Sequence, residues 1–176
     1  HVLSRRQRQM CIRDSYSSLL GGGMSSRLFQ EIREKRGLVY GISSFSSSYT
    51  DTGIFGIYCG TGENQIQELI PVLCDQLNQS PNSITEKEID RGKAQLKASL
   101  MMGRESAFRR CESAARQLLV FNRIIEPAET IKNIDKVSKE TVQKIANEIV
   151  KGPITISSIG PLSKLENIDK IQSRIN

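Results

Sequence analysis

Residues 19–60, LLGGGMSSRLFQEIREKRGLVYGISSFSSSYTDTGIFGIYCG, decide the fold of this chain. After three consecutive glycines, a short charged segment carries its apolar residues at helical spacing, and Gly37 follows it. Ser25 or Ser26 can cap a helix by accepting hydrogen bonds from its free N–H groups, and a glycine readily ends one. The pattern therefore predicts a helix that ends at about Arg36.

Two runs of β-branched, aromatic and serine residues follow this helix, over 38–49 and 53–61. The residues between the two runs, Thr50, Asp51 and Thr52, suit a turn. We expect an antiparallel hairpin. Its many serines suggest that one face lies against helices while the other faces a polar space.

Outward from this stretch, the chain is mostly helical by the spacing of its apolar residues. Residues 16–20 resemble the end of a helix whose start is absent. Downstream, the pattern predicts a helix over 64–78, and Pro71 should either kink this helix or move its start to a later residue. A loop at 81–83 and a capping box at 85–88 follow, and the capping box begins a long helix that runs towards Phe121 and breaks near Gly103. Short helices begin at Pro127 and Ser138, then come a strand over 153–160 and a last helix with Ile168 and Ile171.

The predicted fold class is α+β, an antiparallel sheet packed against several helices. Three strands are few for such a sheet, so we expect the domain to be incomplete at its N-terminus.

The composition narrows the possible partners. A chain of 176 residues can bury a core as one domain. No apolar run approaches the roughly 20 residues of a membrane helix, so no membrane partner is predicted. The four cysteines lack the paired short spacing of a zinc site or a disulfide framework. No basic stripe with interleaved aromatic residues occurs, so no nucleic-acid partner is predicted despite the net charge of +6.

Residues 1–15, HVLSRRQRQMCIRDS, differ in character from the rest of the chain. Four arginines against one aspartate give this segment half of the net charge, and its apolar residues lack periodicity. The string RRQRQMCIRDS resembles translated adapter sequence. We therefore expect 1–15 to be a non-native leader and 16–176 to be the domain itself, with a basic amphipathic arm as the alternative.

The single histidine, His1, lies in that segment. Residues 16–176 therefore cannot form a Ser-His-Asp triad, a Cys-His pair or a histidine-rich metal site. The glycines before the helix could cradle an anion, but they do not follow a predicted strand and their spacing is unspecific.

The core of the opening stretch, SRLF at 26–29 and IREKRGLVY at 32–40, resembles the C-terminal domain of the insulinase/pitrilysin zinc metallopeptidases. That family includes the mitochondrial processing peptidase and its bacterial relatives. The resemblance extends from about Tyr16 to Gly160. It implies a zinc site of the inverted His-x-x-Glu-His type in an N-terminal domain that this sequence does not contain. No cofactor is expected in this chain.

The same resemblance implies roles for Arg33 and Tyr40, whose spacing matches an arginine and a tyrosine that reach the peptide near the scissile bond. A guanidinium offers several fixed donors to peptide carbonyls, and a phenol can donate to a developing oxyanion. Without the resemblance, Arg33 would be a solvated helix charge and Tyr40 a residue packed in the sheet.

The glycine turn, Gly21, Gly22, Gly23 and Met24, resembles a shorter form of the glycine-rich loop that aids substrate recognition in the processing peptidase α subunit. These four residues are a further substrate-binding candidate. We also expect the hairpin to offer a backbone edge for pairing with an extended peptide.

The function predicted from these features is the half of a zinc metalloendopeptidase that binds no metal and holds an extended peptide. Its partners would be the peptide substrate and a zinc-binding domain, in the same chain or in a partner subunit. The chain alone should then be inactive. The alternative is a non-catalytic subunit or scaffold of a two-chain, processing-peptidase-like complex.

Overall fold

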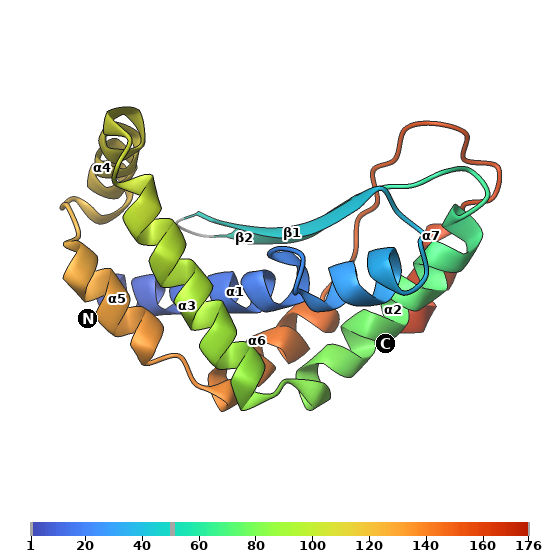
Figure 1. The fold of residues 1–176 in the computed structure, drawn as a ribbon, viewed down its shortest axis with the longest axis horizontal. Coiled ribbons are helices and arrows are strands. Elements are labelled where there is room, and N and C mark those ends of the chain that lie inside the picture. The colour runs from blue at the N-terminus through green and yellow to red at the C-terminus, as the bar shows by residue number, and fades with distance from the viewer. Residues whose placement is uncertain (1, 50–51, 176) are drawn as a thin grey trace.

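The structure of the protein is a computed structural model that describes residues 2–49 and 52–175. Its elements, labelled in Figure 1, are α1 (Val2–Gly21), the π-helix η1 (Phe29–Glu34), β1 (Gly41–Ser48), β2 (Gly53–Gly60), α2 (Ile66–Ser83), α3 (Glu86–Gly103), α4 (Ala107–Phe121), α5 (Pro127–Asp135), α6 (Lys139–Val150) and α7 (Ile168–Ile175).

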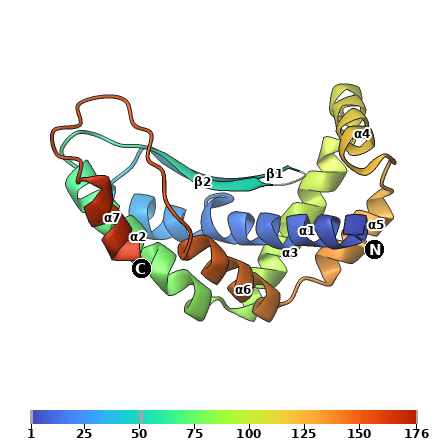
Figure 2. The same ribbon diagram turned by 180° about the vertical axis from the view of Figure 1, so that it is seen from behind.

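Helix α1 lies at the centre of the molecule, between the hairpin and the remaining helices. The hairpin covers one side of α1, and α3, α5 and α6 pack on its other sides (Figures 1 and 2). Tyr16 and Leu20 of α1 are completely buried, and Leu19 is nearly so. Each such side chain contributes roughly 1.5–3 kcal/mol by leaving water. The predicted α+β class is confirmed: helices pack on an antiparallel sheet.

Residues 2–15 belong to α1, which runs without a break to Gly21. Cys11 and Ile12 are buried in the core, and the Ser15 hydroxyl donates to the Cys11 carbonyl at 2.8 Å. The helix end predicted at 16–20 is confirmed, and the segment of residues 2–15 is helical although its apolar residues lack periodicity. This geometry does not bear on its origin, and the non-native leader at 1–15 stays a prediction. His1 lies outside the described residues.

The predicted hairpin is confirmed. β1 pairs with β2 in an antiparallel register that runs from Gly41 opposite Gly60 to Ser48 opposite Gly53. The first strand begins at Gly41 rather than Leu38, because Leu38 and the residue after it are buried in the core. The turn positions 50 and 51 lie outside the described residues.

The strand expected at 153–160 is absent from the described part of the chain, where β1 and β2 make the one sheet. A strand needs a neighbour for its backbone N–H and C=O groups. Here the Ile154 N–H donates instead to the Gln172 side chain at 3.0 Å, and Ile159 is fully exposed. The segment is extended, but it pairs with no ladder among these residues.

Helix α2 continues through both of its prolines, so the loop predicted at 81–83 is wrong and Pro71 does not delay the helix start. Pro81 has no N–H for the Leu77 carbonyl four residues earlier. The Ser80 hydroxyl donates to that carbonyl at 2.8 Å in its place. This substitute hydrogen bond explains how the helix passes Pro81.

Other predicted boundaries are confirmed. The long helical stretch breaks after Gly103, Pro127 is the first residue of α5, and the Ser138 hydroxyl caps α6. Ile168 and Ile171 lie in α7, as expected. No helix among residues 2–49 and 52–175 combines the length and the apolar character that a bilayer crossing requires.

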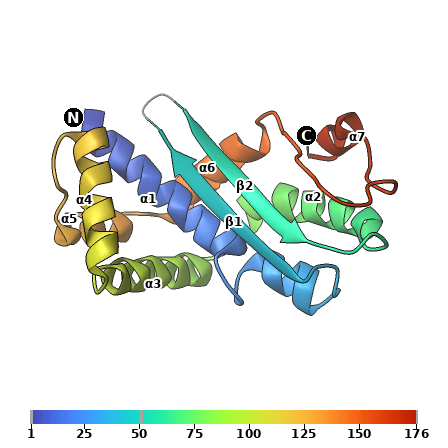
Figure 3. The ribbon, with the colours of Figure 1, turned by 90° about the horizontal axis from the view of Figure 1, so that it is seen from above.

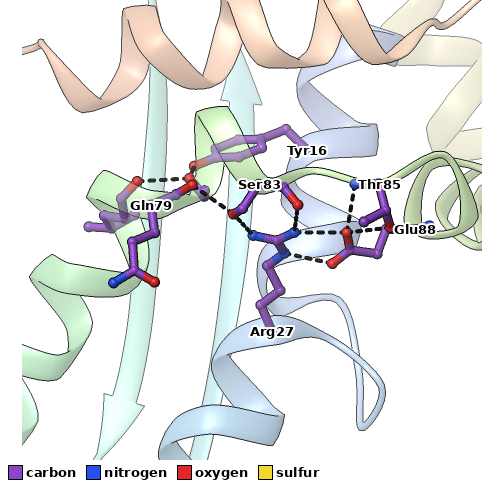
Figure 4. A network of polar contacts seen from close by, with 8 residues as sticks. Tyr16, Arg27, Gln79, Ser83, Thr85 and Glu88 are labelled. Carbon is purple, nitrogen blue, oxygen red and sulfur yellow. Dashed lines mark hydrogen bonds and ion pairs between the residues drawn. The ribbon is translucent and has the colours of Figure 1, made fainter.

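Arg27, from the SRLF segment, joins three elements (Figure 4). Its guanidinium forms a bidentate pair with the Glu88 carboxylate, at 2.6 and 2.8 Å, and donates to the Ser83 carbonyl at 2.6 Å. Glu88 also accepts from the Thr85 N–H at 2.9 Å, which completes the predicted capping box at the start of α3. One arginine thus fixes the segment before η1 to the end of α2 and the first turn of α3.

We predict that Arg27→Ala lowers the free energy of unfolding by about 1.5–3 kcal/mol, because the little-exposed Glu88 carboxylate loses two charge-assisted hydrogen bonds. Urea denaturation measures the change. Arg36→Ala, at an exposed position of the same segment, is the control and should stay within about 0.5 kcal/mol. Equal losses in both variants would contradict this account of Arg27.

The same pair predicts an acid-sensitive stability. Burial alone would raise the pKa of Glu88, but hydrogen bonds from Arg27 and Thr85 outweigh it and lower the pKa to about 2. The stabilisation is complete above the ordinary pKa near 4.5 and is lost as the pH falls towards 2. Unfolding measured across this range should show a smaller pH dependence in Glu88→Gln than in the native chain. An unchanged slope would contradict the assignment.

Candidate functional site

Arg33 lies on η1, where the sequence predicts an ordinary α-helix. The Lys35 N–H donates to the Gln30 carbonyl, five residues earlier, at 3.0 Å, so the turn is wider than in an α-helix. The Leu38 N–H donates to the Ile32 carbonyl at 3.0 Å across Gly37, as in the cap that closes many helix ends. Gly37 ends the helix with φ +63°, a left-handed conformation that favours glycine. The predicted stop at Gly37 is confirmed, and the helix type is corrected.

The serine cap expected for this helix is not formed. The Ser26 hydroxyl donates to the Gly23 carbonyl at 2.6 Å, so it closes the glycine turn rather than accepting from the helix N–H groups. A serine hydroxyl can donate to a backbone carbonyl a few residues earlier instead of accepting from the N–H groups of the helix.

The Arg33 guanidinium lies over the Phe29 ring, with its Cζ 4.7 Å from the ring centroid. Phe29 is buried, so this cation–π contact holds the guanidinium on a fixed support. Within residues 2–49 and 52–175, Arg33 has no ion pair or side-chain hydrogen bond, whereas its neighbour Lys35 pairs with Glu31. Its N–H groups are therefore available to an external acceptor.

Tyr40 stands at the start of the hairpin, and its side chain is 80% exposed. Its backbone N–H donates to the Gly60 carbonyl at 2.8 Å, which extends the ladder by one bond. Leu38 and Val39, the two residues before it, are buried. The Thr61 hydroxyl donates to the Leu38 carbonyl at 2.6 Å and fixes this connection.

The structure thus exposes both Arg33 and Tyr40, on either side of a short anchored connection. Direct contact between the two side chains is not among the contacts of the described residues. Tyr40 is exposed, so the simple structural interpretation of Tyr40 as a residue packed in the sheet does not describe its environment.

The glycine turn is required by close packing. A Cβ on Gly21 would lie 2.5 Å from the Ser44 backbone nitrogen, and one on Gly22 would lie 2.5 Å from the Ser18 carbonyl. Gly23 has φ +149°. Each glycine therefore has a structural reason, where the end of α1 meets β1.

Side chains from two helices fix the carbonyls of this turn. The Gln95 amide donates to the Gly22 carbonyl, and the Gln30 amide donates to the Met24 carbonyl at 2.7 Å. The Met24 side chain is exposed. The turn is therefore rigid, and its one projecting side chain is apolar.

A cleft of about 250 Å³ lies beside the turn, between α1, β1 and α3. It is lined mainly by hydroxyl and amide groups: Asp14, Ser17, Ser18, Gly22, Ser46, Gln95, Leu96 and Ser99. Burial raises the pKa of Asp14, and the Ser46 hydroxyl donates to its carboxylate at 2.6 Å. Most of these polar groups form hydrogen bonds with one another, so the residues that line the cleft contribute to the packing of α1, β1 and α3.

One face of the hairpin lies against α1, as expected, but the outer face differs from the expectation. Ser44 and Ser46 point towards α1, where the Ser44 hydroxyl donates to the Ser17 carbonyl at 2.7 Å. The outer face instead exposes Phe45, Ile54 and Tyr58. The prediction of a polar outer face is wrong, because the number of serines does not show on which face they lie. Ser44 and Ser46 alternate in phase with the buried Ile42 and therefore face α1.

Phe45 also covers a glycine on the opposite strand. A Cβ on Gly56 would lie 2.2 Å from the Phe45 ring, so the ring lies directly against this backbone. The outer face of the hairpin is therefore a continuous apolar surface. Counting from Ile42 with a period of two could have found it in the sequence.

No group of three His, Cys, Asp or Glu side chains among the described residues is arranged to hold a metal ion. The donor set available here does not fit a zinc ion, which prefers three or four such ligands in tetrahedral geometry.

The family model described as "Peptidase M16 inactive domain" matches residues 13–96. A protein named "Uncharacterized zinc protease" from Rickettsia felis is 35% identical over 81% of this chain, and the zinc protease YmxG of Bacillus subtilis is 36% identical over 82%. The β subunit of the mouse mitochondrial-processing peptidase is 31% identical over 88%. The chain spans about a third of the length of these curated relatives, namely 35%, 36% and 32%.

Solved structures show the same fold. A chain of complex III2 from Candida albicans superposes with a TM-score of 0.81 at 20% identity, covering 93% of this chain and 42% of that one. A protease from Helicobacter pylori superposes with a TM-score of 0.65 at 25% identity, covering 80% of this chain and 34% of that one.

We predict that Gly21→Ala destabilises the chain by about 1–3 kcal/mol, since the new Cβ must push α1 away from β1. Thermal unfolding measures the loss. Gly41→Ala is the matched control because a Cβ there meets nothing within 4 Å. A tolerated Gly21→Ala would mean that the turn does not depend on this close approach.

Proposed function

Because this chain belongs to the M16 peptidase family through the inactive domain that residues 13–96 match, we propose that it is the peptide-holding half of a zinc metalloendopeptidase. The single observation that carries the proposal is the state of Arg33. A guanidinium stacked on a buried ring, without a carboxylate partner in the described chain, is pre-arranged for an external acceptor.

Arg33 binds peptide carbonyls in this proposal. The guanidinium presents several N–H donors in one plane, and the Phe29 ring holds that plane without consuming a donor. A lysine at this position would present a compact, strongly hydrated charge and would lose the stacked geometry. The role of Arg33 is therefore orientation of the substrate backbone.

Tyr40 donates its phenolic proton as a hydrogen bond to the carbonyl oxygen that gains negative charge during attack. Such a donor acts mainly on the transition state, because the oxygen accepts more strongly as its charge develops. The exposure of the ring and the fixed backbone on either side of it suit this task.

The hairpin gives an extended peptide a surface to lie on. β1 and β2 pair only with each other in the described residues, so each strand keeps an outer edge of backbone N–H and C=O groups. A peptide can add to such an edge as a further strand. Phe45 and Tyr58 would contact its apolar side chains, and the turn from Gly21 to Met24 would contact its flank.

The zinc belongs to another domain in this proposal, since the donor set here does not fit one. The zinc-binding half would lie in the same polypeptide or in a partner subunit. The similarity to proteins named as a zinc protease and as a subunit of the mitochondrial-processing peptidase supports a zinc-binding half outside this chain.

The test joins this chain to the zinc-binding half of the Bacillus subtilis relative and measures kcat and KM on a fluorogenic peptide. We expect Tyr40→Phe to lower kcat by about 10–100-fold with KM little changed, because a transition-state donor is lost. Arg33→Ala should instead raise KM by about 10-fold, because ground-state binding is lost.

Tyr49→Phe and Arg36→Ala are the matched controls, since both residues are exposed and neither has a role in the proposal. The chain without the zinc-binding half provides the blank and should show no zinc-dependent hydrolysis. An unchanged kcat in Tyr40→Phe together with an unchanged KM in Arg33→Ala would favour the non-catalytic scaffold instead.

A further inference from the structure

The connection between Arg33 and Tyr40 is tied to the end of β2 by one side chain, that of Thr61. The Thr61 hydroxyl donates to the Leu38 carbonyl at 2.6 Å. The N–H group of the same buried leucine donates to the Ile32 carbonyl at 3.0 Å, one residue before Arg33. The two hydrogen bonds of Leu38 therefore join the helix that carries Arg33 to the end of the hairpin.

Figure 3 shows this junction from above, at the end of the hairpin opposite its turn. η1 packs against β1 there, and β2 ends at Gly60, directly before Thr61. Thr61 is partly buried, and its hydroxyl is the group that reaches across to the other strand. The junction thus combines η1, the residues before β1 and the first residue after β2.

The ladder of the hairpin shifts by one residue at this junction. Gly41 lies opposite Gly60 in the register of the strands, and the Tyr40 N–H also donates to the Gly60 carbonyl, at 2.8 Å. Two consecutive residues before and at the start of β1 therefore meet one residue of β2, as in a β-bulge. A bulge bends its strand and can re-aim a side chain.

This shift explains why Tyr40 points away from the core. Side chains alternate along a strand, so Tyr40, two residues before the buried Ile42, would face α1 in a regular ladder. Its side chain is exposed instead. Among residues 2–49 and 52–175, no backbone hydrogen bond joins Leu38 or Val39 to the residues after β2. The Thr61 hydroxyl takes the place of such a bond and holds the chain on the far side of the bulge.

We propose that Thr61 is a positioning residue for Tyr40, whose phenol it holds out of the sheet through the Leu38 carbonyl and the bulge. Thr61 itself contacts no substrate. The inference rests on the proposed function of Tyr40, but the effect of Thr61 on the backbone is measurable without that function.

The expected cost of losing the hydroxyl follows from the geometry of hydrogen bonds. A donor to a developing oxyanion acts over a narrow range of distance and direction, and a misplacement of about 1 Å can cost about 100-fold in rate. Without the hydroxyl, the Leu38 carbonyl loses its donor and the backbone before Tyr40 loses its link to β2. Because Tyr40 acts on the transition state in the proposal, the loss should appear in kcat.

The first test measures kcat and KM with the chain joined to the zinc-binding half of the Bacillus subtilis relative. Thr61→Val keeps the shape of the side chain without its hydroxyl, and we expect it to lower kcat by about 10-fold with KM little changed. Thr61→Ser keeps the hydroxyl and should rescue kcat to within about 2-fold of the native value. Thr155→Val, at an exposed position outside the junction, is the control.

A double-mutant cycle separates positioning from a general loss of stability. If Thr61 acts through the phenol, Thr61→Val should lower kcat by less than about 2-fold in the Tyr40→Phe background. A general effect on the fold would lower kcat by the same factor in both backgrounds. That result, or an equal loss in Thr61→Val and Thr61→Ser, would overturn the inference.

Hydrogen exchange of the full chain, without the zinc-binding half, tests the same hydroxyl independently of catalysis. We expect the Tyr40 amide to exchange about 10-fold faster in Thr61→Val than in the native chain or in Thr61→Ser. The Leu69 amide, which donates to the Gln65 carbonyl at 2.9 Å in a buried turn, should keep its rate. Its rate reports whether the whole fold has been weakened.

The outcomes distinguish this inference from the proposed function. An unchanged exchange rate of the Tyr40 amide in Thr61→Val would overturn the role of Thr61, whatever the activity. A lower kcat in Tyr40→Phe with an unchanged kcat in Thr61→Val would also overturn it and leave the proposed function standing. An unchanged kcat in Tyr40→Phe would overturn the proposed role of Tyr40, and this inference with it.

Discussion

The bidentate pair between Arg27 and Glu88 is the contact on which the arrangement around η1 depends. It lies between the glycine turn and η1, and it reaches both the end of α2 and the start of α3. Because the carboxylate also completes the cap of α3, the same charge stabilises a helix terminus and a tertiary junction. The orientation of η1, and with it the place of Arg33 on the surface, follows from this junction.

Local signals in the sequence predicted those parts of the fold in which backbone hydrogen-bonding groups find their partners among residues nearby in the sequence. The capping box at Thr85, the Pro127 helix start and the Gly37 stop are of this kind, and all are confirmed. The widened turns of η1 and the passage of α2 through Pro81 depend on hydrogen bonds that spacing does not specify. The unpaired segment at 153–160 depends on a missing neighbour strand, which no local pattern can supply.

The candidate site was partly accessible to sequence reasoning. The motif that contains Arg33 and Tyr40 pointed to two residues that the structure exposes, but it did not indicate Phe29 as the support of the guanidinium. The apolar outer face of the hairpin was not predicted, because the serine content of the strands suggested a polar face. The alternation of side chains along β1, starting from the buried Ile42, indicates the apolar face instead. The glycine turn was predicted to bind substrate from a functional resemblance. The structure gives a packing reason for its glycines, since Gly21 lies tightly against Ser44.

The hydroxyl beside Pro81 has an evolutionary consequence. It donates to the Leu77 carbonyl that the proline leaves without an N–H, and it must therefore accept its 2.7 Å hydrogen bond from the Tyr16 phenol (Figure 4). Losing Ser80 alone would strand both groups in the core. Losing Pro81 first would return an N–H to the carbonyl, and Ser80 would then be required only by the Tyr16 phenol. A change at position 80 is therefore less costly after a change at position 81 than before it.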